Sequence, residues 1–216
     1  MTPSPLSRVA GPIALVAGAL VVVTRLVIAL TTPRDAEALA AYVLTPTHAI
    51  NSVASIVAFA LLALALVAGY EREANEAATA GVIAFGAALV GIVFMAGDWW
   101  FEAFAVPRMG ELVPQLFDTF VGGRLQFGGV SSFVLFGIGW AMFGVASLRA
   151  RVFPGGLAAT ILLSGILSGV PIGVVYLSGQ AILGLTIMWL GAWMLRSPVI
   201  ASAAVEPSRG PHQPAA

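Results

Sequence analysis

Long apolar stretches constrain the fold of this chain more than any other feature. Uninterrupted runs of apolar residues cover positions 12–30, 47–69, 77–104 and 127–148. About 20 consecutive apolar residues are enough for a helix to cross the roughly 30 Å of hydrocarbon in a bilayer. Within that hydrocarbon a helix satisfies its backbone polar groups by itself. Each of the four runs therefore predicts one transmembrane helix.

A fifth apolar run, residues 157–195, is too long for a single helix. Its middle, residues 171–179, reads PIGVVYLSG, and the proline, glycines and serine there favour a break. We therefore expect two helices, at 157–172 and 178–195. Together with the first four they predict an all-α membrane bundle of six transmembrane helices.

The six helices are expected to form one domain, residues 1–196, because no linker-like segment interrupts them. Residues 197–216 are rich in Pro, Ala and Ser and show no apolar period, which predicts a disordered tail. The first apolar run is not followed by a small-residue cleavage site, so we interpret it as a retained helix and not as a signal peptide.

Composition excludes several classes of function. Hydrophobic residues make up 59% of the chain and charged residues 9%, far from the balance of a soluble protein. The net charge is zero and no basic stripe is present, so nucleic acid is not expected as a partner. The chain contains neither cysteine nor lysine, which excludes disulfides, thiolate metal sites and Schiff-base cofactors. No nucleotide-binding or hydrolase motif occurs, and we predict no cofactor and no metal.

The arginines predict the orientation in the membrane, because basic residues concentrate on the cytoplasmic side. Six arginines flank one side of the expected helices and three flank the other, which places both termini and the tail in the cytoplasm. The six cytoplasmic arginines are Arg8, Arg72, Arg149, Arg151, Arg196 and Arg209, and the three outer ones are Arg34, Arg108 and Arg124.

The basic residues of the chain are arginines and histidines only. Together with the Ala, Gly and Pro content, this favours a bacterial plasma membrane.

Two further patterns concern the surroundings of the helices. Residues 112–121 alternate apolar and polar positions with a helical period, which predicts a short amphipathic helix on the outer membrane surface between the third and fourth helices.

Gly165, Gly169 and Gly173 form a small-xxx-small series that favours close helix packing. The neighbour is either a helix of the same chain, which we favour, or a second copy or another membrane protein.

Polar residues from four expected helices fall at one membrane depth, the outer third. Counting about 1.5 Å per residue from the helix ends places them at similar heights, and Asp98 and Glu102 lie one turn apart on one helix face. We therefore predict an outward-facing polar pocket. Its candidate residues are Arg25, His48, Asn51, Asp98, Glu102, Arg124 and Gln126.

Simpler explanations exist for these residues. Asp98 and Glu102 sit beside Trp99 and Trp100, which are typical of the interfacial aromatic belt where a helix leaves the membrane. Arg25 is either an anchor that extends to the interface or the ion-pair partner of Asp98.

For His48 and Asn51, a capping and hydrogen-bonding role near the helix start, with Thr45 or Thr47, is the simplest interpretation. A metal site of His48, Asp98 and Glu102 is disfavoured because no metal-ligand spacing accompanies them.

Four short motifs give the chain a resemblance to known proteins: THAIN and YERE at the two ends of the second expected helix, WFEAFAVP at the end of the third, and FGVASLRARVFPGG after the fourth. With them the chain resembles a group of small, mostly actinobacterial polytopic membrane proteins. It resembles more loosely the six-helix membrane proteins grouped under DUF4386. The resemblance implies a helix count and no activity.

Three functions remain open from the sequence. A permease or binding protein for a small solute or for proton-coupled transport would use Asp98 or Glu102. An accessory or assembly subunit of a membrane complex would use its glycine-rich faces. An intramembrane enzyme would require an acid and base pair such as His48 with Glu102.

Overall fold

The computed structural model describes residues 5–119 and 123–197, and the regular structure in that part of the chain is entirely helical. Six α-helices and one 3-10 helix follow one another without a strand among the described residues. They are α1 (Pro5–Thr31), α2 (Ala36–Tyr42), α3 (Pro46–Leu112), η1 (Pro114–Thr119), α4 (Gly123–Ala150), α5 (Gly155–Ser168) and α6 (Gly173–Arg196).

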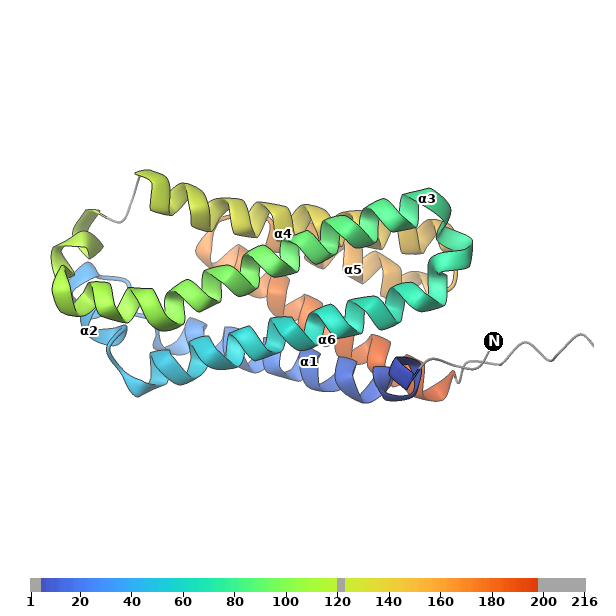
Figure 1. The fold of residues 1–216 in the computed structure, drawn as a ribbon, viewed down its shortest axis with the longest axis horizontal. Coiled ribbons are helices and arrows are strands. Elements are labelled where there is room, and N and C mark those ends of the chain that lie inside the picture. Colours follow the sequence, from blue (N-terminus) through green and yellow to red (C-terminus); the bar gives the residue numbers. More distant parts are fainter. Residues whose placement is uncertain (1–4, 120–122, 198–216) are drawn as a thin grey trace, which may run out of the picture.

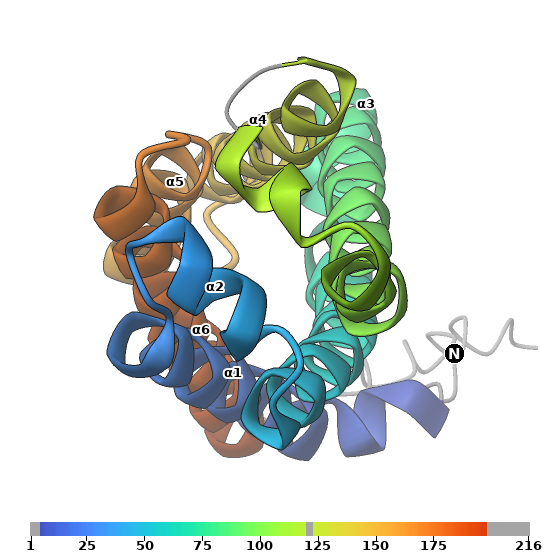
Figure 2. The same ribbon diagram turned by 90° about the vertical axis from the view of Figure 1, so that its left-hand side faces the viewer.

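The long helices lie side by side along one axis (Figure 1). Each packs against its neighbour in the sequence, and α6 packs against α1. The result is a ring of antiparallel helices, visible from one end in Figure 2. The start of α1 lies beside the end of α6, where Gly11 contacts Leu195. Both ends of the helical domain therefore lie at the same end of the bundle.

Helix α3 contains two passes along the bundle that are joined without a loop. The chain reverses at Ala78, whose φ of 49° and ψ of −150° are not helical. The predicted helices at 47–69 and 77–104 are both present, as the arms Pro46–Ala74 and Glu76–Leu112. The first arm begins at a regular cap, because the Thr45 hydroxyl accepts a hydrogen bond from the His48 amide at 3.3 Å.

Five helical segments of the described chain are long and apolar enough to cross a membrane. The expected helix at 157–172 is shorter than predicted: α5 has 14 residues, or about 21 Å at 1.5 Å per residue. It ends at Ser168 because Gly169 caps it and Pro171 has no amide hydrogen to donate. The six-span arrangement therefore stays a prediction. The five segments are Val9–Thr31, Pro46–Ala74, Glu76–Leu112, Gln126–Ala150 and Gly173–Arg196.

Large apolar side chains cover much of the outside of the bundle. Leu30, Ile50, Val93 and Val174 are all exposed, as are many others on the long helices. A soluble monomer rarely exposes so much contiguous apolar surface. The surface and the five long segments together indicate a multi-pass membrane protein.

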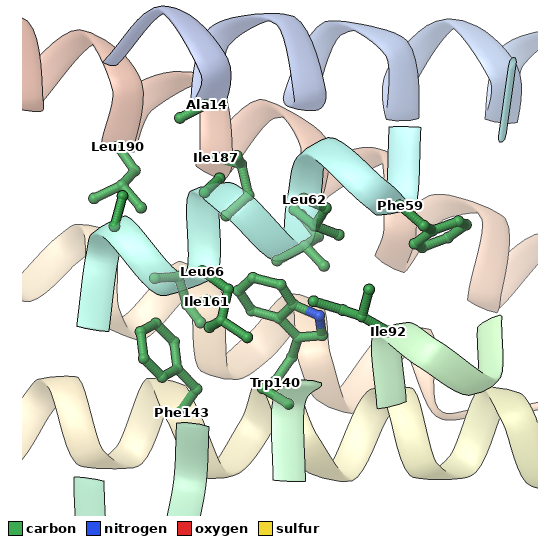
Figure 3. Close-up of a cluster of buried hydrophobic side chains, with 14 of the residues drawn as sticks. Ala14, Phe59, Leu62, Leu66, Ile92, Trp140, Phe143, Ile161, Ile187 and Leu190 are labelled. Atoms are coloured by element: carbon green, nitrogen blue, oxygen red, sulfur yellow. The ribbon is translucent and has the colours of Figure 1, made fainter. Parts of the chain in front are cut away.

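The middle of the bundle is filled by apolar side chains. Trp140 of α4 is fully buried and points into a cluster that includes Leu62 and Leu66 of α3 and Ile187 of α6 (Figure 3). Residues from five helices, α1 and α3–α6, contribute to this cluster. No channel is therefore open through the middle of the described structure.

Glycines set the close approach between helices. On α1 and α6, Gly18 faces Gly184, and Gly11 faces Gly191, with backbone oxygens of the partner helix where a Cβ would stand. Both pairs are seven residues apart along their helices, which keeps them on one side. The first and last helices therefore meet backbone to backbone.

The glycines predicted to promote packing behave differently from one another. Gly165 and Gly169 pack against α4, at Trp140, Ala141 and Gly137, so their neighbour belongs to the same chain. Gly173 does not share their helix: it begins α6, and no atom lies within 4 Å of the position of a Cβ. The break at 169–172 separates it from the series, and the chain resumes its helix earlier than the predicted residue 178.

Two short helices lie across the end of the bundle that is opposite the termini (Figure 2). Helix α2 packs against η1, and Val43, Val106 and Phe117 form a small buried cluster there. The 3-10 helix η1 lies within the segment 112–121, where we predict an amphipathic helix, and the position of that segment on a membrane surface stays a prediction. Helix α3 continues to Leu112, and residues 120–122 lie outside the described part of the chain.

Candidate functional site

Arg25 is the most unusual residue of the bundle, because its side chain is only 2% exposed although it carries a guanidinium group. It lies about 9 Å, or six residues, before the end of α1. Its Nη1 donates to Oε1 of Gln180 on α6 at 2.8 Å, and its Nη2 donates to Oγ of Ser55 on α3 at 2.6 Å. Nη2 also lies 3.3 Å from Oγ1 of Thr24. Arg25 thus connects α1, α3 and α6 at one level.

Neither predicted role of Arg25 is found. The side chain does not extend to the interface, since it is enclosed by the bundle. No Arg25 nitrogen lies within 4.0 Å of an Asp98 oxygen, so the two form no ion pair among the described contacts. Hydroxyl and amide oxygens, together with an aromatic ring, surround the guanidinium instead. Neutral acceptors bond the two terminal nitrogens of this buried cation, while its Nε has no hydrogen-bond partner among the described atoms.

Trp99 forms one wall around Arg25. The Arg25 Cζ lies 4.2 Å from the centroid of the Trp99 ring, a cation–π contact, and 5.7 Å from that of Phe59. Trp99 is only 8% exposed, whereas Trp100 is 58% exposed. The prediction that both tryptophans belong to the interfacial belt is therefore wrong for Trp99. Consecutive residues point about 100° apart on a helix, so the two rings face opposite environments.

Asp98, Glu102 and Gln126, three of the candidate residues, line one cavity. It has a volume of about 290 Å³ and lies between the second arm of α3, the start of α4 and the start of α6. Aromatic side chains form most of its remaining wall, and Phe133 and Tyr176 pack together with ring centroids 4.5 Å apart. Asp98 also borders a second hollow between α3 and α4, lined by Ser131 and Ser132. Three of the seven candidate residues therefore border one cavity, at the end of the bundle opposite the termini.

His48 lies against Glu102 but is occupied by a structural contact. Its Nε2 lies 2.9 Å from the backbone oxygen of Glu102 and 3.9 Å from Oε2 of the same residue. A carbonyl oxygen only accepts hydrogen bonds, so Nε2 carries the hydrogen and donates it. His48 thereby ties the start of the first α3 arm to the second arm. This contact agrees with the simpler interpretation of His48.

The last two candidates are placed differently. Asn51 is buried one turn before Ser55, and the Ser55 hydroxyl donates to its backbone oxygen at 2.9 Å while accepting from Arg25. Asn51 therefore supports the Arg25 contacts through its main chain. Arg124 lies in the first turn of α4, and its side chain falls outside the described part of the structure.

A groove between α1 and α6 adjoins the site from the other side. Arg25 lies on it, Arg34 borders it, and its volume is about 400 Å³. Tyr176 borders both this groove and the 290 Å³ cavity. Tyr176 therefore lies between the groove that Arg25 borders and the cavity that the carboxylates border.

Sequence reasoning missed two partners of Arg25. Gln180 is fully buried, and its Nε2 has no hydrogen-bond partner; Ser55 is also fully buried. The signal for Gln180 was available, because it is the one amide side chain in the apolar run 178–195. An isolated amide in such a run costs free energy unless it forms a hydrogen bond. It therefore predicts a polar partner on a neighbouring helix. Ser55 carried no such signal, since serines are frequent in membrane helices.

A buried carboxylate lies at the opposite end of the bundle. Glu73, near the end of the first α3 arm, is 0% exposed, and neither of its oxygens has a hydrogen-bond partner. The neighbouring Ser147 hydroxyl donates to the Phe143 backbone oxygen at 2.9 Å instead. No described group of three His, Asp or Glu side chains is arranged to hold a metal ion, at either end.

Compared with protein-family models, curated proteins and solved structures, the chain matches none of them. Its class rests on its own features: a helical bundle with five segments fit to cross a membrane and one buried polar site. The predicted resemblance to small actinobacterial membrane proteins stays a prediction.

Proposed function

We propose that the protein binds a small polar solute in the cavity lined by Asp98, Glu102 and Gln126 and acts as a permease for it. The observation that carries this proposal is the position of two carboxylates in a cavity of about 290 Å³ within a largely apolar bundle. Ionisable groups at membrane depth are costly and commonly mark the path of a solute or ion.

The proposal includes an arrangement in the bacterial plasma membrane. Helix α5 serves as a sixth, short span, because it returns the chain between α4 and α6. Both termini then face the cytoplasm, in agreement with the arginine distribution. The cavity opens toward the outside, and η1 lies on the outer surface. The resemblance to the six-helix membrane proteins implies the same number of spans.

Introduced cysteines test the orientation cleanly, because the natural chain has none. Gln126→Cys, at the cavity, should react with a membrane-impermeant maleimide in intact cells. Glu76→Cys, at the other end of the bundle, should react after the membrane is permeabilised and not before. The reverse pattern would contradict the outward-facing cavity.

Transport is tested with the purified protein in liposomes. We expect uptake of at least one solute from a panel of labelled choline, glycine, acetate and glycerol, faster than in protein-free liposomes. Asp98→Asn should reduce that uptake, whereas Glu111→Gln, an exposed carboxylate on the same helix, should not. Absence of both uptake and binding for every solute would contradict the proposal.

One observation favours a second function, that of a non-transporting accessory subunit. The side chains around Trp140 close the middle of the bundle, so no path connects the cavity with the opposite end. A permease needs a second conformation in which this cluster opens. Binding without uptake in the liposome experiment would favour the accessory function. The intramembrane enzyme loses support, because His48 is engaged with a backbone oxygen.

A further inference from the structure

The wall of the 290 Å³ cavity has a distinctive chemistry. It combines two carboxylates with four aromatic rings, and no arginine or histidine lines it among the side chains that the structure describes. Its volume lies just below the range for small-molecule sites, about 300–1,000 Å³, which favours a small ligand. The six residues are Asp98, Glu102, Trp99, Phe101, Phe133 and Tyr176.

The charges around the cavity do not cancel. Asp98 and Glu102 lie one turn apart on the same face of α3, where like charges repel. The cation of Arg25 lies behind the Trp99 ring, bonded to Gln180 and Ser55, and it makes no ion pair within 4.0 Å. Among the side chains that the structure describes, two carboxylates against one guanidinium leave one net negative charge beside the cavity. A ligand with a single positive charge restores the balance.

The aromatic rings favour the same kind of ligand. Cations are attracted to the faces of aromatic rings, and cages of such rings recognise ammonium groups. One face of Trp99 already contacts the Arg25 guanidinium. Phe133 and Tyr176 present further rings on the opposite wall.

Trp99 adds a second, independent observation. Its side chain is more than nine-tenths buried, it lines the cavity, and its indole Nε1 donates to no acceptor among the described atoms. A buried donor without an acceptor costs free energy. Nε1 itself is buried, so a ligand oxygen accepts from it once the indole ring turns toward the cavity.

We propose that this cavity binds a small organic monocation, a protonated amine or quaternary ammonium, that carries an oxygen acceptor near its charged nitrogen. The carboxylates and rings hold the charged nitrogen, and the Trp99 N–H donates to the oxygen. The inference rests on the proposed function and names the solute class of that same site.

The experiment compares two molecules of the same shape. Choline and 3,3-dimethyl-1-butanol differ by a quaternary nitrogen in place of a carbon, so only the charge changes. Binding to the full chain in nanodiscs is measured by calorimetry. We expect choline to bind about tenfold more tightly or better, because a carboxylate contacts the cation.

Variants assign the effect to the cavity. Asp98→Asn or Glu102→Gln should weaken choline binding about tenfold and leave the neutral analogue unchanged. Glu111→Gln removes the same charge from an exposed position on α3 and should change neither. Thermal unfolding of each variant checks that the fold is kept. If Asp98→Asn does not fold, Glu102→Gln alone decides.

The oxygen acceptor is tested separately with tetramethylammonium, which lacks it. Trp99→Phe should remove the preference for choline over tetramethylammonium while both still bind. An unchanged preference would overturn the role of the indole N–H.

The outcomes separate the two proposals. Equal binding of choline and its neutral analogue would contradict the proposal that the ligand is a monocation, and the proposed function would still stand. If acetate binds, and binds more tightly to Asp98→Asn than to the natural protein, the monocation proposal is also contradicted and the proposed function still stands. If none of the cationic, neutral and anionic probes binds, the solute site itself is contradicted and both proposals fall.

Discussion

Gln180→Leu tests whether Arg25 is held by the neutral acceptors that surround it. The substitution keeps the volume and removes the oxygen that accepts from Arg25 Nη1 at 2.8 Å. A hydrogen bond to a charged group contributes about 1.5–3 kcal/mol in soluble proteins. Interhelical bonds in membranes average about 0.6 and reach about 1.7 kcal/mol. Because the substitution also removes the unpaired Gln180 Nε2, we expect a net loss of about 1 kcal/mol.

Thermal unfolding in detergent measures this loss. One kcal/mol corresponds to about 2–4 °C in Tm for a chain of this size. The decisive measurement is a double-mutant cycle with Arg25→Met. In the Arg25→Met background, Gln180→Leu should cost nothing, since the unpaired charge is gone. The control is Thr186→Val on the same helix, whose hydroxyl bonds only to Ile182 of its own turn, and it should not couple to Arg25.

Additive effects of Gln180→Leu and Arg25→Met, within about 0.5 kcal/mol, would refute the reasoning. They would mean that the guanidinium is stabilised elsewhere, for example by Trp99 alone. A coupling as large for Thr186→Val would show that the effect belongs to general packing of α6.

Three further predictions concern stability and are checked by the same unfolding measurement. Ala78→Gly should raise Tm, because a non-glycine residue at a φ of 49° carries about 1–3 kcal/mol of strain, and a lower Tm would contradict that strain. Glu73→Met should also raise Tm, since it removes two buried oxygens without partners; a loss would show that the carboxylate has a stabilising partner. Gly184→Ala should lower Tm and reduce the free energy of unfolding by about 1–3 kcal/mol, because its Cβ would stand 2.8 Å from the Gly18 oxygen. The control Gly86→Ala places its Cβ within 4 Å of no atom and should be tolerated.

Apolar run length was enough to predict the helices but not all of their ends. The runs at 47–69 and 77–104 correspond to the two arms of α3. The second arm continues beyond its apolar run to Leu112 and includes charged residues such as Arg108. The reversal at Ala78 carries no proline or glycine at that position, so no local signal marked its form. The split of the fifth run was foreseen, but Gly169 and Pro171 ended α5 early enough to leave it only 14 residues.

The candidate site was predictable in its location and not in its pairing. Counting residues from helix ends brought Asp98, Glu102 and Gln126 to one level, and the structure places them around one cavity. The partner of Arg25 depends on helix rotation, which residue counts alone do not determine. The expected Asp98 pair failed for that reason, because Trp99 and not Asp98 faces Arg25 on the second α3 arm.

Glycine spacing offered a second signal whose meaning only the structure revealed. The series at Gly165 and Gly169 was noticed because its members are four residues apart. Gly184 and Gly191 are seven apart and belong to the contact with α1, where their counterparts are seven apart as well. A search for matching seven-residue glycine intervals in two helices would have predicted that α1 and α6 are neighbours.

The bond between Arg25 and Gln180 has a consequence for the synthesis of the protein. The two residues are separated by 155 positions, so the first helix is made long before its partner exists. At about 5–20 residues per second, roughly 8–30 seconds pass between the two. During that interval the Arg25 guanidinium lacks one of its acceptors, and a nascent first helix is held in place less firmly than the finished one. We expect truncated chains that end before Gln180 to be recognised by membrane proteases or held by insertion chaperones until α6 emerges.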